Sequence, residues 1–373
     1  MSSAVPSPLL GPRVRDDKRR VTRFALSGVH VSIANGLRRT IRGYLPSLGI
    51  VPFPESDTTV TIATNTTPLH NELVKSRLAA IAFNVDPDDD LVGRLEFRLK
   101  LQNVSNETRL VTVGDAELWD TVSEKPLSAE ATKALLPPDP VTGDHSLLLV
   151  LRPPVGTMPG DTIDLRATMR KVTPTDRGTY VLASTCAYGN TPDAKARETA
   201  WRKEDAGDDP TPRALWNEST AGMFVVPESF DFVLRAVGWM DEAALIRAGL
   251  GHMEQRLTVF AEKGENGTLN VTKVKDVLAA HAFDVEVPGD TYALGHCLRH
   301  RLYELACQPQ GMLTLVGFDK HHAHDSLGSL RLIFRNDASA INASHLVARA
   351  AREAAQIYHE LLRQTELKAS ERS

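Results

Sequence analysis

Hydrophobic residues recur at helical spacing near the start of the chain. Between residues 32 and 45, five apolar side chains fall on one arc about 120° wide when drawn as an α-helix. They are Ile33, Leu37, Ile41, Tyr44 and Leu45. The opposite arc carries Asn35, Arg38, Arg39 and Arg42. The pattern predicts an amphipathic helix from Ser32 to Leu45, which follows a strand ending at 28–32 and stops at Pro46 because proline lacks the N–H donor.

Residues 59–63 alternate as a short strand, and Glu72–Ala82 is predicted to form a second helix. The pattern then changes, because apolar and polar residues alternate strictly over 95–102, as in a half-buried strand. Further strands are expected at 146–151, 162–170 and 180–187, separated by proline-containing turns. The span 84–222 is therefore predicted to be β-rich, and its last part, Pro192–Pro212, to be an exposed loop.

The remainder of the chain returns to mixed strands and helices. Strands are expected at 224–226, 230–234, 312–318 and 329–335, and helices at 241–260, 290–306 and 343–367. Asp241 and Asp290 are suitable N-cap residues for the first two of these helices. Glu262–Gly267 is predicted to be a linker, and residues 1–20, with three prolines and a mixed-charge run, a solvated tail.

A short stretch of the first predicted helix is repeated later in the chain. Residues 35–41 and 296–302 align on Leu37 and Leu298, each followed by an arginine, a second basic residue and, two positions further on, an aliphatic residue. The polar side chains of the second copy are His296, Arg299 and His300. Two similar units favour a pseudo-dimer within one chain, although basic amphipathic helices are common in unrelated proteins. The predicted interface consists of Leu37, Ile41, Leu294, Leu298 and Leu302.

Composition narrows the classes of function. The chain has 373 residues, 42% of them hydrophobic and 24% charged, which is typical of a globular protein with about two or three domains. The 43 basic and 47 acidic residues give a net charge of −4, which excludes a strongly basic nucleic-acid coat or a polybasic membrane binder. Three scattered cysteines fit a reducing compartment. No signal peptide or membrane span is expected, so no membrane partner is expected either.

None of the candidate catalytic or metal-binding segments fits its template. The acidic run at 86–90 begins like a calcium loop, but Leu91 and Phe97 stand where glycine and glutamate are required. Residues 321–325 hold three histidines without a nearby cysteine, in a predicted loop, so zinc is not favoured. The glycines at 264–267 lack the lysine and hydroxyl residue of a phosphate loop. No catalytic residue, metal or cofactor is therefore expected.

Two blocks of the N-terminal part resemble a known family. Residues 33–41, continuing to 46–50, are similar to the signature helix of the RNA polymerase alpha subunit and its archaeal and eukaryotic counterparts, which carry Asn-Ala-Leu-Arg-Arg and then a proline turn. Residues 65–73 and 77–81 resemble that family's next block, Asn-Thr-Ser followed by Asp-Glu and His-Arg-Leu-Gly-Leu-Ile-Pro.

The C-terminal part resembles the smaller partner of that family, of the eleventh-subunit or archaeal L type. Residues 290–299 are similar to its His-Thr-Leu-Gly-Asn-Leu-Leu-Arg helix, with His296 in place of asparagine. Residues 315–318 followed by His324 are similar to its Gly-Tyr and Pro-His-Pro turn, without the prolines. Residues 151–153 resemble a Leu-Arg-Pro-Gly turn that lacks its glycine. Cys186 is the only cysteine of the insert region, so the cysteine-bound cluster of some relatives is not expected.

The resemblance implies an α+β fold with two alpha-type dimerisation modules that pair within one chain. The large-partner module would comprise 21–83 and 223–262, the β-rich insert domain 84–222, and the small-partner module 268–373. The chain would be a non-catalytic assembly-platform subunit of a DNA-directed RNA polymerase, a nucleotidyltransferase complex. Its partners would be the second-largest, largest and small polymerase subunits, with DNA contacted only through the complex. The residues implied to face the second-largest subunit are Asn35, Arg38, Arg39, Glu72 and Arg77, although Glu72 and Arg77 could instead pair with each other.

Cells normally keep the two partners as separate chains, and a fused form is associated with nucleocytoplasmic large DNA viruses. This architecture implies a cytoplasmic location, in a viral factory or virion, with the nucleus as the alternative. A different class of function is a stand-alone nucleic-acid-binding adaptor that uses the basic helix faces, but the net charge of −4 speaks against it. A third class, a hydrolase or transferase, would need converging titratable groups that no spacing suggests.

Overall fold

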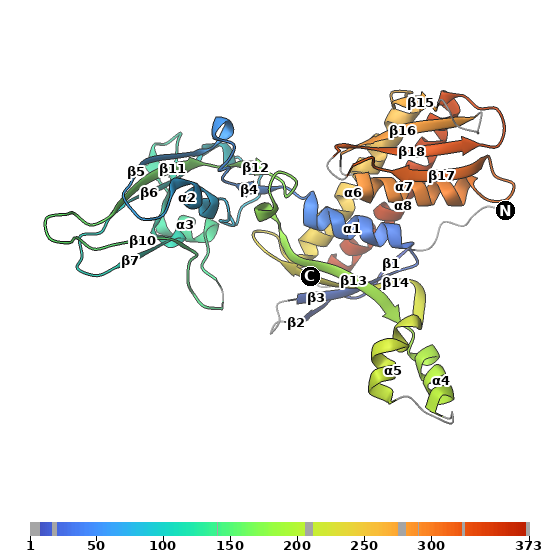
Figure 1. Cartoon of the computed structure of the whole chain (residues 1–373), viewed down its shortest axis with the longest axis horizontal. Coiled ribbons are helices and arrows are strands. Elements are labelled where there is room, and N and C mark those ends of the chain that lie inside the picture. Colours follow the sequence, from blue (N-terminus) through green and yellow to red (C-terminus); the bar gives the residue numbers. More distant parts are fainter. Residues whose placement is uncertain are drawn as a thin grey trace. The chain divides into compact units, whose positions relative to one another are not determined.

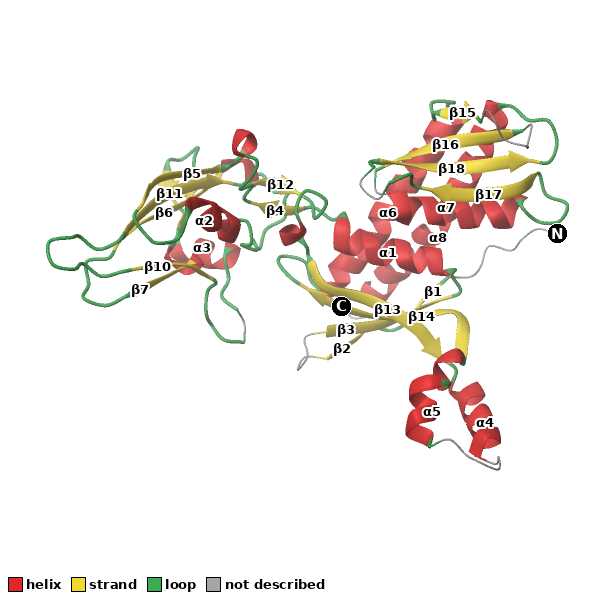
Figure 2. Ribbon diagram, in the orientation of Figure 1, coloured by secondary structure: helices red, strands yellow, loops and turns green. Residues whose placement is uncertain are grey.

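The computed structural model describes residues 8–16, 21–139, 141–205, 212–274, 281–289, 291–322 and 325–370. It is a mixed fold of helices and several sheets (Figures 1 and 2). The described residues form two compact units. The first takes in those up to Ile41, those of Thr185–Arg235 and those of Glu242–Ser373, and the second comprises Arg42–Ser184 and Ala236–Asp241.

One sheet of the first unit combines strands from the start of the chain with two strands from its middle. Its strands are β1 (Leu9–Leu10), β3 (Val21–Ser27), β14 (Val225–Ala236) and β13 (Ala183–Pro192), in that order, and β2 (Val14–Asp16) also pairs with β3. β3 and β14 run antiparallel, and Phe24 lies opposite Phe232 with the two rings stacked 4.8 Å apart. Alternate residues of both strands are buried, which is the pattern of a sheet with one face against the core.

A second sheet of this unit comes from the C-terminal part. Its order is β15 (Val271–Lys273), β16 (Ala282–Pro288), β18 (Leu327–Phe334) and β17 (Leu313–Asp319), with all neighbours antiparallel. Helix α7 (Thr291–Ala306) packs on β17, where Gly295 lies directly against the ring of Phe318.

Two long helices of the first unit pack antiparallel. α6 (Glu242–Glu265) and α8 (Ala340–Ser370) lie side by side in Figure 1. At one end the Ser344 hydroxyl donates a hydrogen bond of 2.8 Å to the carbonyl of Gly264, and near the other end His359 pairs with Glu254 at 2.9 Å. Glycine at 264 permits this approach, since a Cβ there would lie 2.7 Å from that of Ala348.

Helix α1 (Val31–Gly43) contacts two helices of the C-terminal part through its backbone. The Tyr358 hydroxyl of α8 donates to the carbonyl of Ile33 at 3.0 Å, and the Cys297 thiol of α7 donates to the carbonyl of Ser32 at 3.2 Å. A Cβ added at Gly36 would lie 2.3 Å from the Tyr358 hydroxyl and 3.2 Å from the Cys297 sulfur. Glycine is therefore what allows α1 to sit this close to α7 and α8.

The second unit is built around a five-stranded antiparallel sheet. Its order is β5 (Val60–Asn65), β11 (Thr162–Thr168), β6 (Leu95–Gln102), β8 (Glu117–Asp120) and β9 (Lys125–Pro126). Two further strand pairs are β7 (Arg109–Thr112) with β10 (Leu147–Leu151) and β4 (Ser47–Gly49) with β12 (Arg170–Val172). The core includes Leu78 of helix α2 (Asn71–Leu78) together with Phe97, Leu99, Leu148 and Leu165, and α3 (Ala129–Leu135) follows β9.

Most predicted elements occur with their ends shifted by a few residues. The helices predicted at 32–45, 72–82 and 343–367 are α1, α2 and α8, and the alternating strand at 95–102 is β6. The strand expected at 28–32 is wrong, because β3 ends at Ser27 and Gly28 turns the chain with φ +68°. The linker expected at Glu262–Gly267 is also wrong in its first part, where α6 continues to Glu265. Asp290 and His324 lie outside the described residues.

The prediction of an exposed loop at Pro192–Pro212 is wrong over residues 194–205. This segment forms α4 (Ala194–Asp205), and α5 (Arg213–Ser219) follows it. The Asp193 carboxylate accepts a hydrogen bond of 2.9 Å from the N–H of Ala196, as an N-cap residue does. Trp201 and Trp216 meet edge to face at 5.4 Å and form a small core of their own. Helix α4 therefore stands where the loop was predicted over 194–205, and it shares a small core with α5.

The prediction of a solvated tail at 1–20 is wrong for residues 8–16, which include β1 and β2, two strands that pair with β3. Leu10 is buried, and its N–H donates to the side-chain oxygen of Gln364 at 2.9 Å. The amide nitrogen of Gln364 in turn donates to the carbonyl of Pro8 at 2.8 Å. This segment is therefore attached to both β3 and α8.

The close approach of α1 generates a stability prediction. Gly36→Ala should lower the free energy of unfolding by about 1–3 kcal/mol, because the new methyl group overlaps the Tyr358 hydroxyl, which is held by Ile33. Gly43→Ala in the same helix meets nothing within 4 Å and should be neutral or slightly stabilising. Urea unfolding of the full chain, followed by circular dichroism, measures both. Equal stability of the two variants would contradict the close approach.

Candidate functional site

Three of the predicted docking residues lie on α1, and two of them are joined. The Nε and Nη2 atoms of Arg38 donate to the Asn35 side-chain oxygen at 3.0 and 2.8 Å. Both residues are half-buried. Asn35 therefore holds the Arg38 guanidinium in one orientation. Burial raises the pKa of Tyr188 on β13, and the nearby Arg38 charge partly offsets this rise.

Arg39, the third of these residues, is directed at α7. Its guanidinium carbon lies 5.4 Å from the centroid of the Tyr292 ring, and the Lys320 amine lies 5.5 Å from the same centroid. Such cation–π contacts are worth about 0.5–1 kcal/mol at exposed sites and more when water is excluded. Burial lowers the pKa of His296 on α7, and the charges of Arg299 and Arg39 lower it further. The basic face of α1 thus meets residues from the repeated motif.

All five predicted interface residues are buried, on two different helices. Leu37 and Ile41 lie on α1, and Leu294, Leu298 and Leu302 lie on α7. A Cβ at Gly249 of α6 would lie 3.0 Å from a methyl group of Leu37 and 2.7 Å from a side-chain carbon of Ile41. The apolar stripe of α1 therefore contacts α6, which belongs to the same predicted module.

The contact of α1 with α7 and α8 uses residues that sequence reasoning missed. It runs through the backbone around Ser32 and Ile33 and through Gly36, which meet Cys297 and Tyr358. A glycine inside a helical pattern lowers helix propensity and commonly marks close packing. Gly36 was thus the available sequence signal, whereas nothing in the local pattern singles out Tyr358.

Glu72 and Arg77, the other two predicted docking residues, lie on α2 in the second unit. Arg77 donates a hydrogen bond of 2.7 Å from Nη1 to the carbonyl of Leu148, so it ties α2 to β10. Glu72 is exposed, and among the described residues it forms no ion pair with Arg77. The alternative of an intrachain pair is therefore not the arrangement found.

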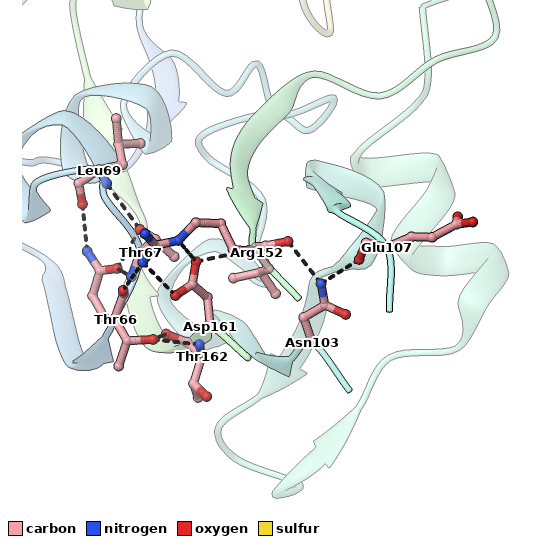
Figure 3. Close-up of polar contacts among 10 residues, drawn as sticks. Thr66, Thr67, Leu69, Asn103, Glu107, Arg152, Asp161 and Thr162 are labelled. Carbon is pink, nitrogen blue, oxygen red and sulfur yellow. Dashed lines mark hydrogen bonds and ion pairs between the residues drawn. The ribbon is translucent and has the colours of Figure 1, made fainter. Parts of the chain in front are cut away.

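The block at 65–73 forms a hydrogen-bonded turn. The Asn65 amide nitrogen donates to the carbonyl of Leu69 at 2.8 Å, and its side-chain oxygen accepts from the N–H of Thr67 at 3.0 Å. Thr66 extends β5 against β11, because its N–H donates to the carbonyl of Thr162 at 3.1 Å. Figure 3 shows these contacts at one end of the sheet.

The predicted turn at 151–153 meets this block through Arg152. The Asp161 carboxylate accepts from the backbone N–H and the Nε of Arg152, both at 2.9 Å, and from its Nη2 at 3.1 Å (Figure 3). Nη2 also reaches the carbonyl of Thr66 at 3.4 Å. Asn103 joins the same end of the sheet by donating to the carbonyls of Leu151 and Glu107. Two separate sequence motifs thus meet through the Arg152 guanidinium, which pairs with Asp161 and reaches the Thr66 carbonyl.

These groups form a structural clamp rather than a reaction centre. Hydrogen bonds from Arg152 hold the pKa of the Asp161 carboxyl below its ordinary value, so it stays charged and paired.

Across the described ranges, no three His, Cys, Asp or Glu side chains are placed to hold a metal ion. In the acidic run at 86–90, Asp88 is bound by Lys171 at 2.5 Å. No helix in the described part of the chain is long and apolar enough to cross a membrane.

Comparison with known proteins adds one local likeness. No family model matches the chain. Over 86 residues it is 36% identical to the DNA-directed RNA polymerase subunit Rpo3 of Pyrococcus furiosus. The matched region is 22% of this chain and spans 30% of that relative's length. This likeness supports an RNA polymerase alpha-like subunit, in agreement with the motifs of the N-terminal part.

The clamp of Figure 3 generates a prediction for the second unit. Asp161→Ala should lower its stability by about 1–3 kcal/mol, because the carboxylate, only 8% exposed, leaves several donors unpaired when removed. Asp164→Ala, on the same sheet, removes a pair with the 80% exposed Lys100 and should cost less than about 1 kcal/mol. Urea unfolding compares the two variants, and a larger loss at Asp164 would contradict the assignment of the clamp.

The same carboxyl predicts a pH dependence. Because the pKa of Asp161 is lower in the folded chain, the unfolded chain binds more protons at acidic pH. The stabilisation is therefore complete above about pH 5 and is lost as the pH falls through the folded pKa. Wild type should lose more stability than Asp161→Ala between about pH 5 and pH 3. Parallel pH profiles of the two chains would refute this expectation.

Proposed function

We propose that this chain is an assembly-platform subunit of a multisubunit DNA-directed RNA polymerase, with an alpha-like module and its smaller partner fused as an intramolecular pseudo-dimer. The sequence assigns 21–83 with 223–262 to the large-partner module, 84–222 to the insert domain and 268–373 to the small-partner module. The compact units divide the chain differently, because 42–83 belong to the second unit and the described residues of 185–222 to the first. The observation that carries the proposal is the packing of α1 against α7 and α8 around Gly36. The local likeness to Rpo3 supports the choice of family.

The composition of the first unit supports a pseudo-dimer. The proposed large-partner part contributes the sheet of β3 and β14 with helices α1 and α6, and residues 268–373 contribute the other antiparallel sheet with α7 and α8. α6 and α8 pack along each other, and α1 contacts α7 and α8 at Gly36. Covalent linkage gives such partners an effective concentration of around the millimolar range, so that pairing no longer depends on protein concentration.

The docking role rests on the Asn35–Arg38 pair. An oriented guanidinium can donate two hydrogen bonds to a carboxylate of the partner in a directional contact. We assign this surface to the second-largest polymerase subunit, with the largest and the small subunits joining afterwards. Catalysis would belong to the magnesium-binding carboxylates of the largest subunit, and DNA would be reached only through the complex.

The fused architecture also motivates the proposed origin. The two partners are normally separate chains, so we assign the fusion to a nucleocytoplasmic large DNA virus and the chain to the cytoplasmic factory or virion, with the nucleus as the alternative. Imaging of the tagged chain in producing cells tests this location.

The docking surface is tested by Arg38→Glu in the full chain. The variant should remain folded but lose at least about tenfold in co-purification of the two large polymerase subunits, since a charge reversal at a paired arginine costs more than about 1.4 kcal/mol of binding. Arg202→Glu on α4, which is 77% exposed, is the matched control and should co-purify normally. Mass spectrometry quantifies the captured subunits.

Retained assembly by Arg38→Glu would refute the docking assignment. The isolated chain provides the test of the nucleic-acid adaptor as an alternative. An adaptor would bind DNA with a log affinity that falls linearly as log salt rises, whereas a platform subunit would show no such binding.

A further inference from the structure

A stacked pair of histidines joins the two halves of the first unit. His30 directly precedes α1, and His300 lies on α7. Their ring centroids are 3.3 Å apart with an angle of 11° between the planes. The rings line a small cavity of about 20 Å³, which is room for about one water molecule and gives protons a route to the pair.

The hydrogen bonds of His30 define its protonation state. Its Nδ1 accepts a bond of 3.2 Å from the N–H of Ser32 and lies 3.0 Å from the Ser32 hydroxyl oxygen. A nitrogen that accepts from a backbone N–H carries no proton, so the proton of this ring sits on Nε2 and the ring is neutral. A charged His30 would have to break the contact that holds it at the start of α1.

The surroundings give the pair little compensation for a positive charge. The charged groups that face it are Glu228 on β14, Arg299, Arg301 and Glu304 on α7, and Glu353 on α8, which binds Arg301. Glu304 lies 3.5 Å from His300 but is also bound by Arg301 at 2.7 Å. The amino-terminal end of α1 adds a partial positive charge next to His30.

We propose that the His30–His300 stack is a proton-sensitive contact that holds α7 against the start of α1 when both rings are neutral and releases it when they are protonated. Two charged imidazoles at this separation repel each other, which disfavours the stack. Protonation of His30 at Nδ1 would also break its hydrogen bond with the N–H of Ser32. Acidification would therefore loosen the packing of α7 against the start of α1 within the first unit.

The pKa values of the two rings are consistent with this role. The pKa of His300 is lowered to about 4, mainly by burial and next by the proximity of His30. Burial is also the main cause that lowers the pKa of His30. Since an exposed histidine titrates near 6.5, the opened form takes up protons first as the pH falls, and the contact weakens between about pH 6.5 and pH 4.

Hydrogen exchange of the full chain measures this opening. After correction for intrinsic exchange rates, amides of α7 should lose about twentyfold in protection between about pH 7 and pH 5, the factor expected for one histidine with a pKa of 6.5 when opened and 4 when packed. In His300→Phe the ring can stack but cannot be protonated, so most of this loss should disappear. His321→Phe, at an exposed position, is the matched control and should behave as wild type.

Equal pH dependence of α7 protection in wild type and His300→Phe would overturn the proposal. A second measurement covers the case in which the variant does not fold. In the wild-type chain, with its 12 histidines labelled at the ring carbon, the NMR signal assigned to His300 should still be that of a neutral imidazole at pH 5 in the folded protein. If the His300 imidazole is protonated by pH 5.5 while the chain is folded, the pair is not held neutral and the proposal fails.

Discussion

The absence of a side chain at Gly36 is the constraint on which the arrangement of the first unit depends. The Tyr358 hydroxyl occupies the space where a Cβ would be, and its hydrogen bond to the carbonyl of Ile33 leaves it little freedom to move. The thiol of Cys297 fills the adjacent space and binds the carbonyl of Ser32. One turn of α1 is thus attached to both α7 and α8 through its backbone, and the polar residues on either side of Gly36 take their positions from it.

The long elements could be predicted from the sequence because their periodicity is strong. β6 alternates over its whole length, and α8 repeats its apolar positions for several turns. Helices α4 and α5 were missed because their shared core is small and centred on Trp201 and Trp216, whose mutual contact is tertiary information. β1 was missed for a related reason: two residues carry no period, and their place follows from pairing with β3 and from Gln364.

The candidate site shows a limit of reasoning from one apolar stripe. α1 was predicted to expose the face opposite Leu37 and Ile41, yet Ser32 and Gly36 on that side are buried as well. Small residues make a second packing face because they allow backbones to approach, and they add almost nothing to a hydrophobic pattern. The sequence predicts that this stripe forms the pseudo-dimer interface, whereas the contacts found place Leu37 and Ile41 against Gly249 of α6. The contact with α7 and α8 uses Gly36 and backbone groups that a hydrophobic stripe does not reveal.

The burial of both faces changes which basic residues of α1 can act on a partner. Arg39 is already engaged with Tyr292, so using it elsewhere would cost this cation–π contact. Arg38 is held by Asn35 through two hydrogen bonds to one oxygen, which orients the guanidinium and leaves further N–H donors for a carboxylate. Because a side chain ordered before binding loses less conformational entropy on binding, we infer that Arg38 contributes more docking energy than Arg39. Asn35 would then act through Arg38, as the residue that positions it.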